Sequence, residues 1–208
     1  MIKPNPAPEV MTSHRNMHEA FVRGAHAIED IVLGSLERSL QMHPGSLTDM
    51  HHIDKETRDQ YRMICFPPLA DRDRRSSMVP HRDFGSMTTL FNILGGLQFL
   101  PSGKNPEVED DWLYIKPVPG CAIINIGDIM VAFTNGALKS PMHRVVPPPG
   151  DQATLTRYSL AYFARPAITT VVKRLDGGNI PPLREGEVEE GLVASEWFVA
   201  KLKAVTLQ

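Results

Sequence analysis

Proline and glycine divide the middle of the chain into short apolar segments, and this division restricts the fold more than any other feature. The 208 residues include 18 prolines and 15 glycines, many of them in turn sequences such as Gly95-Gly96. The apolar segments between the turns are residues 61–66, 88–93, 97–100, 112–115, 122–126, 143–146 and 157–164. Short segments with regular turns predict β-strands of a mainly β fold, closed as a sandwich or barrel, rather than a helical bundle.

Helical periodicity is confined to the two ends of the chain. Between residues 16 and 41, apolar side chains recur every three or four residues: Phe21, Ala25, Ile28, Val32 and Leu36. The prolines of residues 1–12 predict a loose arm, and residues 195–207 predict a terminal helix with Ser195 as its N-cap. We therefore expect an N-terminal arm and helical segment packing on the barrel over 1–60, the barrel over 61–166, and a C-terminal extension and helix over 167–208.

Charge and cysteine content narrow the class of partner. Lys and Arg number 22 and Asp and Glu 24, a net charge of −2 with no basic block, so no nucleic-acid or membrane partner is expected. The same charge balance favours small molecules as partners, and the opening residues lack an apolar signal core, which favours a cytoplasmic protein. Cys65 and Cys121 lie in apolar segments without metal-binding spacing, so buried free thiols are expected.

Three residues within the β region match a metal-binding pattern. His81 and Asp83 are separated by one residue, so in an extended strand both side chains point to the same face. His143, near the start of a later strand, can supply a third ligand. Two imidazoles and one carboxylate on one face of an octahedral ion are the ligand set of non-haem Fe(II) oxygenases, with three positions left for a co-substrate and O₂.

A second pair of residues is suited to anchor such a co-substrate. Arg157 and Ser159 share one face of a predicted strand. A guanidinium group binds a carboxylate through two hydrogen bonds, and the hydroxyl can donate a third. This pair is consistent with 2-oxoglutarate as the co-substrate.

The motifs around these residues resemble one known family. The stretches PHRDFGSMTTLF, GGLQFLP, WLYIKPVPGCAIINIGDIMVAFTNGALKSPMHRVV and RYSLAYFARP are similar to the catalytic domain of the isopenicillin N synthase-like Fe(II)/2-oxoglutarate-dependent oxygenases. The resemblance implies a double-stranded β-helix, or jelly roll, with His81, Asp83 and His143 as iron ligands. It also implies that Arg157 and Ser159 hold 2-oxoglutarate and that Phe163 faces the substrate.

The activity implied by this resemblance is oxidation of a C–H bond in a small molecule. The outcome would be hydroxylation, desaturation or ring formation, with Fe(II), 2-oxoglutarate and O₂ as cofactors and co-substrates and with release of succinate and CO₂. The C-terminal helix could close over such a site.

Two departures from the family pattern keep alternatives open. Members usually carry Asn-x-Tyr before the Pro-rich turn, whereas Ile64 and Phe66 stand at these positions in MICFPP. Relatives also usually begin with a longer region that packs against the barrel. The alternatives are an iron oxidase that does not use 2-oxoglutarate and a shortened, non-catalytic binding protein. A homodimer or a partner is expected to cover the exposed barrel flank, unless the N-terminal helix does so.

The remaining polar residues are assigned to structure or to solvent. Arg72, Arg74 and Arg75 are expected in a solvated loop, and His51 and His52, like the other histidines outside the metal pattern, on the surface. Residues 125–128 are expected to end one strand and begin the next short element, with Asp128 as its cap.

Overall fold

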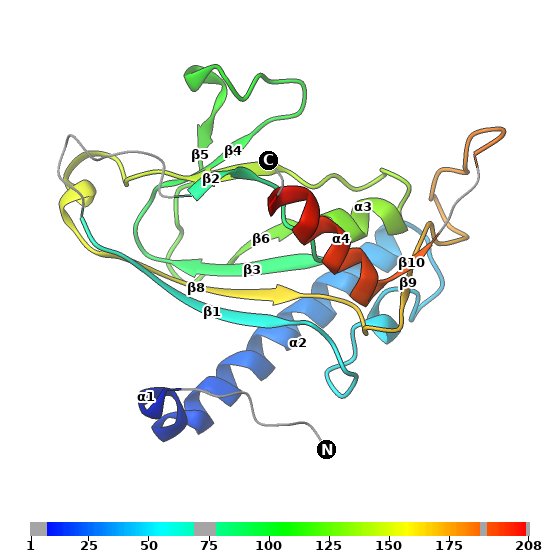
Figure 1. Ribbon diagram of the computed structural model, residues 1–208, viewed down its shortest axis with the longest axis horizontal. Helices are drawn as coiled ribbons and strands as arrows, with labels where there is room; N and C mark the ends of the chain where they lie inside the picture. The colour runs from blue at the N-terminus through cyan, green and yellow to red at the C-terminus, as the bar shows by residue number, and fades with distance from the viewer. Residues whose placement is uncertain (1–7, 69–77, 188–190, 207–208) are drawn as a thin grey trace.

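Two four-stranded antiparallel sheets form the body of the protein, as a computed structural model shows for residues 8–68, 78–187 and 191–206 (Figure 1). The first sheet has the order β1-β8-β3-β6, from β1 (Gln60–Phe66), β8 (Arg157–Ala164), β3 (Met87–Asn92) and β6 (Ile123–Ile126). The second has the order β2-β7-β4-β5, from β2 (Met78–His81), β7 (Met142–Val145), β4 (Leu97–Leu100) and β5 (Leu113–Tyr114). Every strand pair is antiparallel, and the predicted double-stranded β-helix is confirmed.

The predicted strands agree with the observed ones to within about a residue at most ends. The strand β2 is not among them, because Pro80 and the charged residues after it mask its short apolar pattern. A small third sheet pairs β9 (Val171–Val172) with β10 (Leu192–Val193) within the C-terminal extension.

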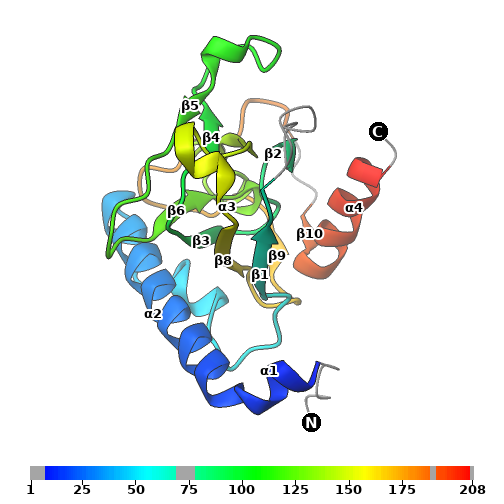
Figure 2. The same ribbon diagram turned by 90° about the vertical axis from the view of Figure 1, so that its left-hand side faces the viewer.

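Helix α2 (Arg15–Ser39) covers one face of the first sheet. Its Ala25 belongs to a buried cluster with Met87, Tyr162 and Ala164, and its Phe21 packs against that cluster. In Figure 2 this helix runs along one side of the molecule, while α4 (Ala194–Thr206) lies on the other. The apolar face of this helix therefore contacts the first sheet.

A second apolar cluster lies where both terminal helices meet the short helix α3 (Asp128–Phe133). Its buried members come from α2, α3, β9, α4 and the connections between them: Leu33, Met42, Leu47, Ile129, Met130, Phe133, Val172, Ile180 and Ala194. None of the described helices is long and apolar enough to cross a membrane.

Several local predictions were wrong. Residues 9–13 form the short helix α1 (Glu9–Ser13) rather than a loose arm. Helix α4 begins at Ala194, so Ser195 lies inside it, and Gly127 rather than Asp128 is the N-cap of α3. The carboxylate of Asp128 instead forms an ion pair with Lys201 of α4 at 2.7 Å.

Both cysteines are free, as expected, but exposed rather than buried. The side chain of Cys65 points to the outer face of β1, and Cys121 precedes β6. Apolar neighbours in the sequence therefore did not predict to which face of the sheet each thiol points.

Candidate active site

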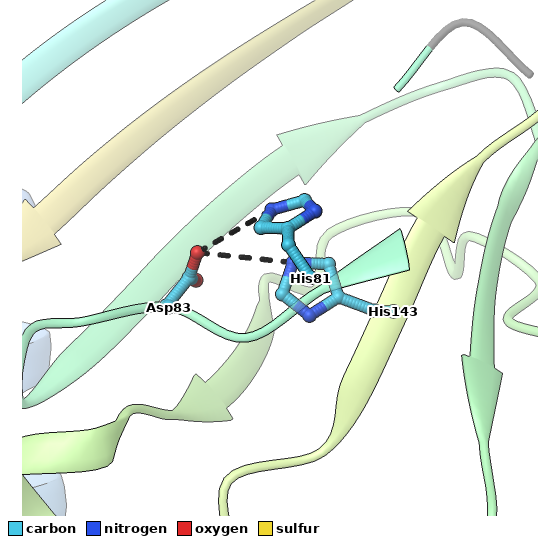
Figure 3. Close-up of side chains that lie close together, drawn as sticks. All are labelled: His81, Asp83 and His143. Atoms are coloured by element: carbon cyan, nitrogen blue, oxygen red, sulfur yellow. Dashed lines mark ion pairs between the residues drawn. The ribbon is translucent and has the colours of Figure 1, made fainter. Parts of the chain in front are cut away.

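His81, Asp83 and His143 converge between two strands of the second sheet (Figure 3). His81 is the last residue of β2, and His143 in β7 is its cross-strand partner. Asp83 lies two residues beyond the end of β2 instead of on the strand, so the predicted extended H-x-D geometry holds only at its first residue. The three side chains nevertheless point toward one another.

The geometry of this cluster suits a single metal ion. The Nε2 atoms of His81 and His143 lie 3.7 and 3.8 Å from Oδ1 of Asp83, and one ligand atom from each residue lies within 4.8 Å of the others. Ligand distances of about 2.0–2.2 Å place adjacent ligands of one ion roughly 3 Å apart, so a single ion can bridge the three atoms.

Hydrogen bonds orient both imidazoles with Nε2 toward the cluster. Nδ1 of His81 lies 2.8 Å from the carbonyl oxygen of Val79, and Nδ1 of His143 lies 3.2 Å from that of Pro141. A carbonyl oxygen can only accept, so each Nδ1 carries the proton and each Nε2 is free to bind a metal. Burial lowers the pKa of His143, which favours the neutral, metal-binding form.

The carboxylate of Asp83 is itself held by two residues that sequence reasoning does not identify as functional. Thr88 and Asn125 both donate hydrogen bonds to its Oδ2 atom. The sequence pattern assigns Asn125 to structure alone. A polar side chain inside the apolar strand β6 is the available signal, because a partly buried amide needs partners.

The cluster lies on the wall of a cavity of about 310 Å³ between the two sheets. The apolar wall residues come from both sheets and their connections: Ile64, Phe66, Met78, Leu90, Leu97, Phe99, Ile115, Ile123, Ile124, Pro141, Val145, Ala161 and Phe163. Its other described wall residues are His81, Asp83, Thr88, Asn125, His143, Arg157 and Ser159. All candidate site residues predicted from the sequence therefore line one cavity.

Arg157 is a buried cation in this cavity, with 2% of its surface exposed. Its Nε donates to the carbonyl oxygen of Gly95 at 2.9 Å, and its Nη1 donates to Ser159 at 3.2 Å. No carboxylate among the described residues lies within 4 Å of it, and burial lowers its pKa. A buried, uncompensated guanidinium is a receptor for an anion.

The two positions that depart from the family pattern lie beside this cation. In the β1–β8 ladder Ile64 is opposite Ser159 and Phe66 is opposite Arg157. The Phe66 ring centroid is 5.9 Å from the guanidinium carbon. Both side chains line the cavity without offering a hydrogen bond.

The remaining expectations have mixed outcomes. Arg72, Arg74 and Arg75 lie outside the described residues. His52 is exposed, but the expectation that His51 is a surface residue was wrong: it is 1% exposed and bonded to Leu47 and Ser86. His26 is also buried, beside Glu29. None of the described residues of α4 lines the cavity, so nothing in their placement supports a lid.

A jelly roll that presents two imidazoles and a carboxylate on the wall of a cavity with a buried arginine defines a class of protein. The donor set suits Fe(II), and Arg157, which has no carboxylate partner among the described residues, suits a dicarboxylate co-substrate. This class is the non-haem iron- and 2-oxoglutarate-dependent oxygenases.

Comparison with known proteins shows the family directly. Residues 57–166 match the 2OG-Fe(II) oxygenase superfamily, and the chain belongs to this family. Membership implies the predicted cofactor pair, Fe(II) and 2-oxoglutarate.

The chain is similar to fungal enzymes of this family. A 2-oxoglutarate-dependent dioxygenase of Aspergillus fumigatus is 35% identical over 206 residues, covering 91% of this chain and 54% of that protein. One of Amanita muscaria is 31% identical over 172 residues, covering 82% of this chain and 81% of that protein. The chain thus spans about half the length of the first relative and most of the second.

Solved structures show the same fold. A full-length Neurospora crassa protein crystallised in complex with alpha-KG has a TM-score of 0.81 at 21% identity, covering 96% of this chain and 61% of that chain. A rice dioxygenase for auxin oxidation has a TM-score of 0.71 at 22% identity, covering 91% and 59%.

Proposed function

We propose that the protein is a non-haem Fe(II)/2-oxoglutarate-dependent dioxygenase that oxidises a C–H bond of a small molecule and releases succinate and CO₂. One observation carries the proposal: three convergent ligand atoms and a buried arginine, without a counter-charge in the part of the chain that the structure describes, line the same cavity in a chain of this family.

The proposed roles follow from the atoms that face the cavity. Nε2 of His81, Oδ1 of Asp83 and Nε2 of His143 would hold the iron. Arg157 and Ser159 would bind the distal carboxylate of 2-oxoglutarate. Water cannot easily replace this contact, so it would fix the orientation of the co-substrate. When bound, the iron and 2-oxoglutarate supply the activation of O₂ and the oxidising equivalents.

The cavity wall also indicates which part of a substrate would enter. Apart from the three ligands, the two donors to Asp83 and the Arg157–Ser159 pair, its described side chains are apolar. Such side chains offer no partner for a charge. We therefore propose that the reacting group of the substrate is uncharged and apolar, and that Phe163 contacts it.

Succinate formation tests the proposed activity. Protein supplied with Fe(II), 2-oxoglutarate, O₂ and ascorbate, which supplies the two electrons that a substrate C–H bond would otherwise give, should form succinate, and Asp83→Ala or His143→Ala should abolish this formation. His52→Ala, at an exposed histidine outside the cavity, is the matched control and should keep the wild-type rate. Undiminished succinate formation by the first two variants would refute the proposal, and repeated turnover would refute a non-catalytic role.

A second candidate keeps the iron but not 2-oxoglutarate. It is favoured by Ile64 and Phe66, because neither can hydrogen-bond a co-substrate held beside Arg157. An oxidase of this type would consume O₂ with its substrate at the same rate whether or not 2-oxoglutarate is present. Measuring O₂ consumption with and without 2-oxoglutarate therefore separates the two candidates.

The proposed partners are a small-molecule substrate and a second polypeptide on the outer flank of the first sheet. Met63 on β1 and Tyr158 on β8 are exposed there, beyond the part of the sheet that α2 covers. Exposed apolar side chains of this kind favour association. Sedimentation of the wild type and of a Met63→Lys, Tyr158→Lys variant would reveal a homodimer through this flank.

A further inference from the structure

The carboxylate of Asp83 receives two hydrogen bonds on one of its oxygens and none from the described residues on the other. Oγ1 of Thr88 donates to Oδ2 at 2.5 Å, and Nδ2 of Asn125 donates to the same atom at 2.9 Å. Oδ1 is the oxygen that lies nearest to Nε2 of both histidines. The two oxygens of Asp83 therefore have different surroundings.

The two donors are cross-strand partners in the first sheet. Thr88 on β3 and Asn125 on β6 are directly opposite each other in the antiparallel ladder, so their side chains leave the sheet on the same face. Thr88 is buried and Asn125 is half-buried, and both line the cavity. A rigid cross-strand pair can hold a carboxylate more firmly than two loop residues can.

The main chain of Asp83 is fixed by the same region. The amide of Asp128, which follows β6, donates to the carbonyl oxygen of Asp83 at 2.8 Å. The amide of Ile129 donates to the carbonyl oxygen of Gly85 at 3.1 Å. One strand and the helix after it therefore hold both the backbone and the carboxylate of Asp83.

The consequence concerns the number of metal positions that Asp83 occupies. With Oδ2 engaged by two donors, only Oδ1 is available to an ion. A carboxylate that bound through both oxygens would fill two of about six octahedral positions and leave only two open. Binding through Oδ1 alone leaves three, enough for a chelating co-substrate and O₂.

We propose that Thr88 and Asn125 are positioning residues that restrict Asp83 to one-oxygen metal binding. The inference rests on the proposed function, because it assumes the iron site described above. Its test measures the metal site itself rather than turnover.

The experiment compares Co(II) binding by the full chain and its variants, with visible absorption as the readout. Thr88→Val and Asn125→Ala each remove one donor, and we expect each to weaken Co(II) binding about 10- to 100-fold, as is common when a partner of a ligand is lost. Their Co(II) spectra should also change, because a freed Oδ2 alters the coordination.

Two further variants distinguish a positioning role from a general loss of structure. Thr88→Ser keeps the hydroxyl group and should bind Co(II) within about 3-fold of the wild type. Thr89→Val removes an equally buried hydroxyl on the same strand, but Thr89 does not line the cavity, so binding and spectrum should not change. Circular dichroism checks that each variant is folded.

The outcomes distinguish this inference from the proposed function. If the wild type binds Co(II) and both Thr88→Val and Asn125→Ala match it in affinity and spectrum, the positioning role is wrong and the iron site stands. If the wild type binds Co(II) no better than Asp83→Ala does, the proposed iron site fails and this inference fails with it.

Discussion

At the scale of single residues, Arg157 carries a charge that the described residues leave without a counter-charge. Its partners are the carbonyl oxygen of Gly95, the hydroxyl of Ser159 and the ring of Phe66. Burying a cation among neutral groups costs free energy, and a ligand carboxylate recovers part of that cost. Function and stability therefore make opposite demands on this residue.

Replacing Arg157 by leucine should separate its role in ligand binding from its effect on stability. Without ligand, we expect the free energy of unfolding of Arg157→Leu to stay within about 1 kcal/mol of the wild type, while protection by 2-oxoglutarate with Mn(II) is lost. Urea unfolding with and without these ligands measures both effects.

Arg144→Leu is the matched control, because Arg144 is also buried but pairs with Gln98 and Glu109 and lies over the Trp112 ring. It should lower the stability by about 1–3 kcal/mol whether or not ligand is present. A comparable loss in Arg157→Leu would show that the guanidinium stabilises the fold.

His51 should make stability depend on pH. Its Nδ1 faces the carbonyl oxygen of Leu47, and its Nε2 lies 2.7 Å from the Ser86 hydroxyl. Burial lowers the pKa of His51 to about 4 from the ordinary 6.5, so the folded protein favours the neutral ring.

Because the folded-state pKa of His51 is depressed, the stabilisation that comes from burying its neutral ring is fully present above pH 6.5. It is lost as the pH falls from 6.5 toward 4. The largest loss is on the order of 3 kcal/mol. His51→Gln should therefore flatten the stability profile between about pH 4.5 and 7, measured by urea unfolding, whereas His52→Gln at the exposed neighbour should not. Parallel profiles for His51→Gln and the wild type would contradict the assignment.

At the scale of elements, the site depends on the close approach of two backbone segments, residues 83–86 and the start of α3. Gly127 and Gly85 meet there, and a Cβ atom at Gly127 would lie 2.2 Å from the carbonyl oxygen of Gly85. The obstructing atom belongs to the backbone, so it cannot move aside as a flexible side chain would. Glycine is required at this position by close approach.

The methyl group added by Gly127→Ala should push the start of α3 away from residues 83–86. We expect a loss of roughly 1–3 kcal/mol in unfolding free energy, typical of overpacking, together with weaker Co(II) binding because Asp83 shifts. Gly24→Ala in α2 is the opposite case, since nothing lies within 4 Å of the position that a methyl group would occupy there. That variant should gain about 0.5–1 kcal/mol from helix propensity, and a Gly127→Ala protein as stable as the wild type would refute the argument.

At the scale of the whole molecule, the cavity joins the two sheets. His81 and His143 come from the second sheet, Thr88, Asn125, Arg157 and Ser159 from the first, and Asp83 from the connection between β2 and β3. A metal and a dicarboxylate bound together would connect these parts across the interior. Their binding free energy should therefore stabilise the entire fold.

Thermal unfolding can measure this coupling. Mn(II) and 2-oxoglutarate added together at about 100 times their dissociation constants should stabilise the wild type by about 2.7 kcal/mol for each site and raise its melting temperature. Asp83→Ala should show no such rise with Mn(II), and Arg157→Leu none with 2-oxoglutarate. An equal rise in all three proteins would mean that the ligands bind elsewhere.

Much of the fold could be predicted from the sequence because its signals are local. Turn residues bound the strands β4 and β8 at the observed positions, and the 3.6-residue period located α2. The strand β2 and the beginning of α4 escaped prediction because a proline and a single serine carried misleading local signals.

What the sequence by itself determined is the set of chemical groups: two imidazoles, a carboxylate, a guanidinium and a hydroxyl, each with a spacing that restricts which can share a strand face. What only the tertiary structure decided is how these groups are supported. Asn125 reaches Asp83 across 42 positions of sequence, and His51 reaches Ser86 across 35. The physical reason is that burial and hydrogen bonding arise from contacts between distant strands, and no local pattern records which polar side chain will meet a partner there.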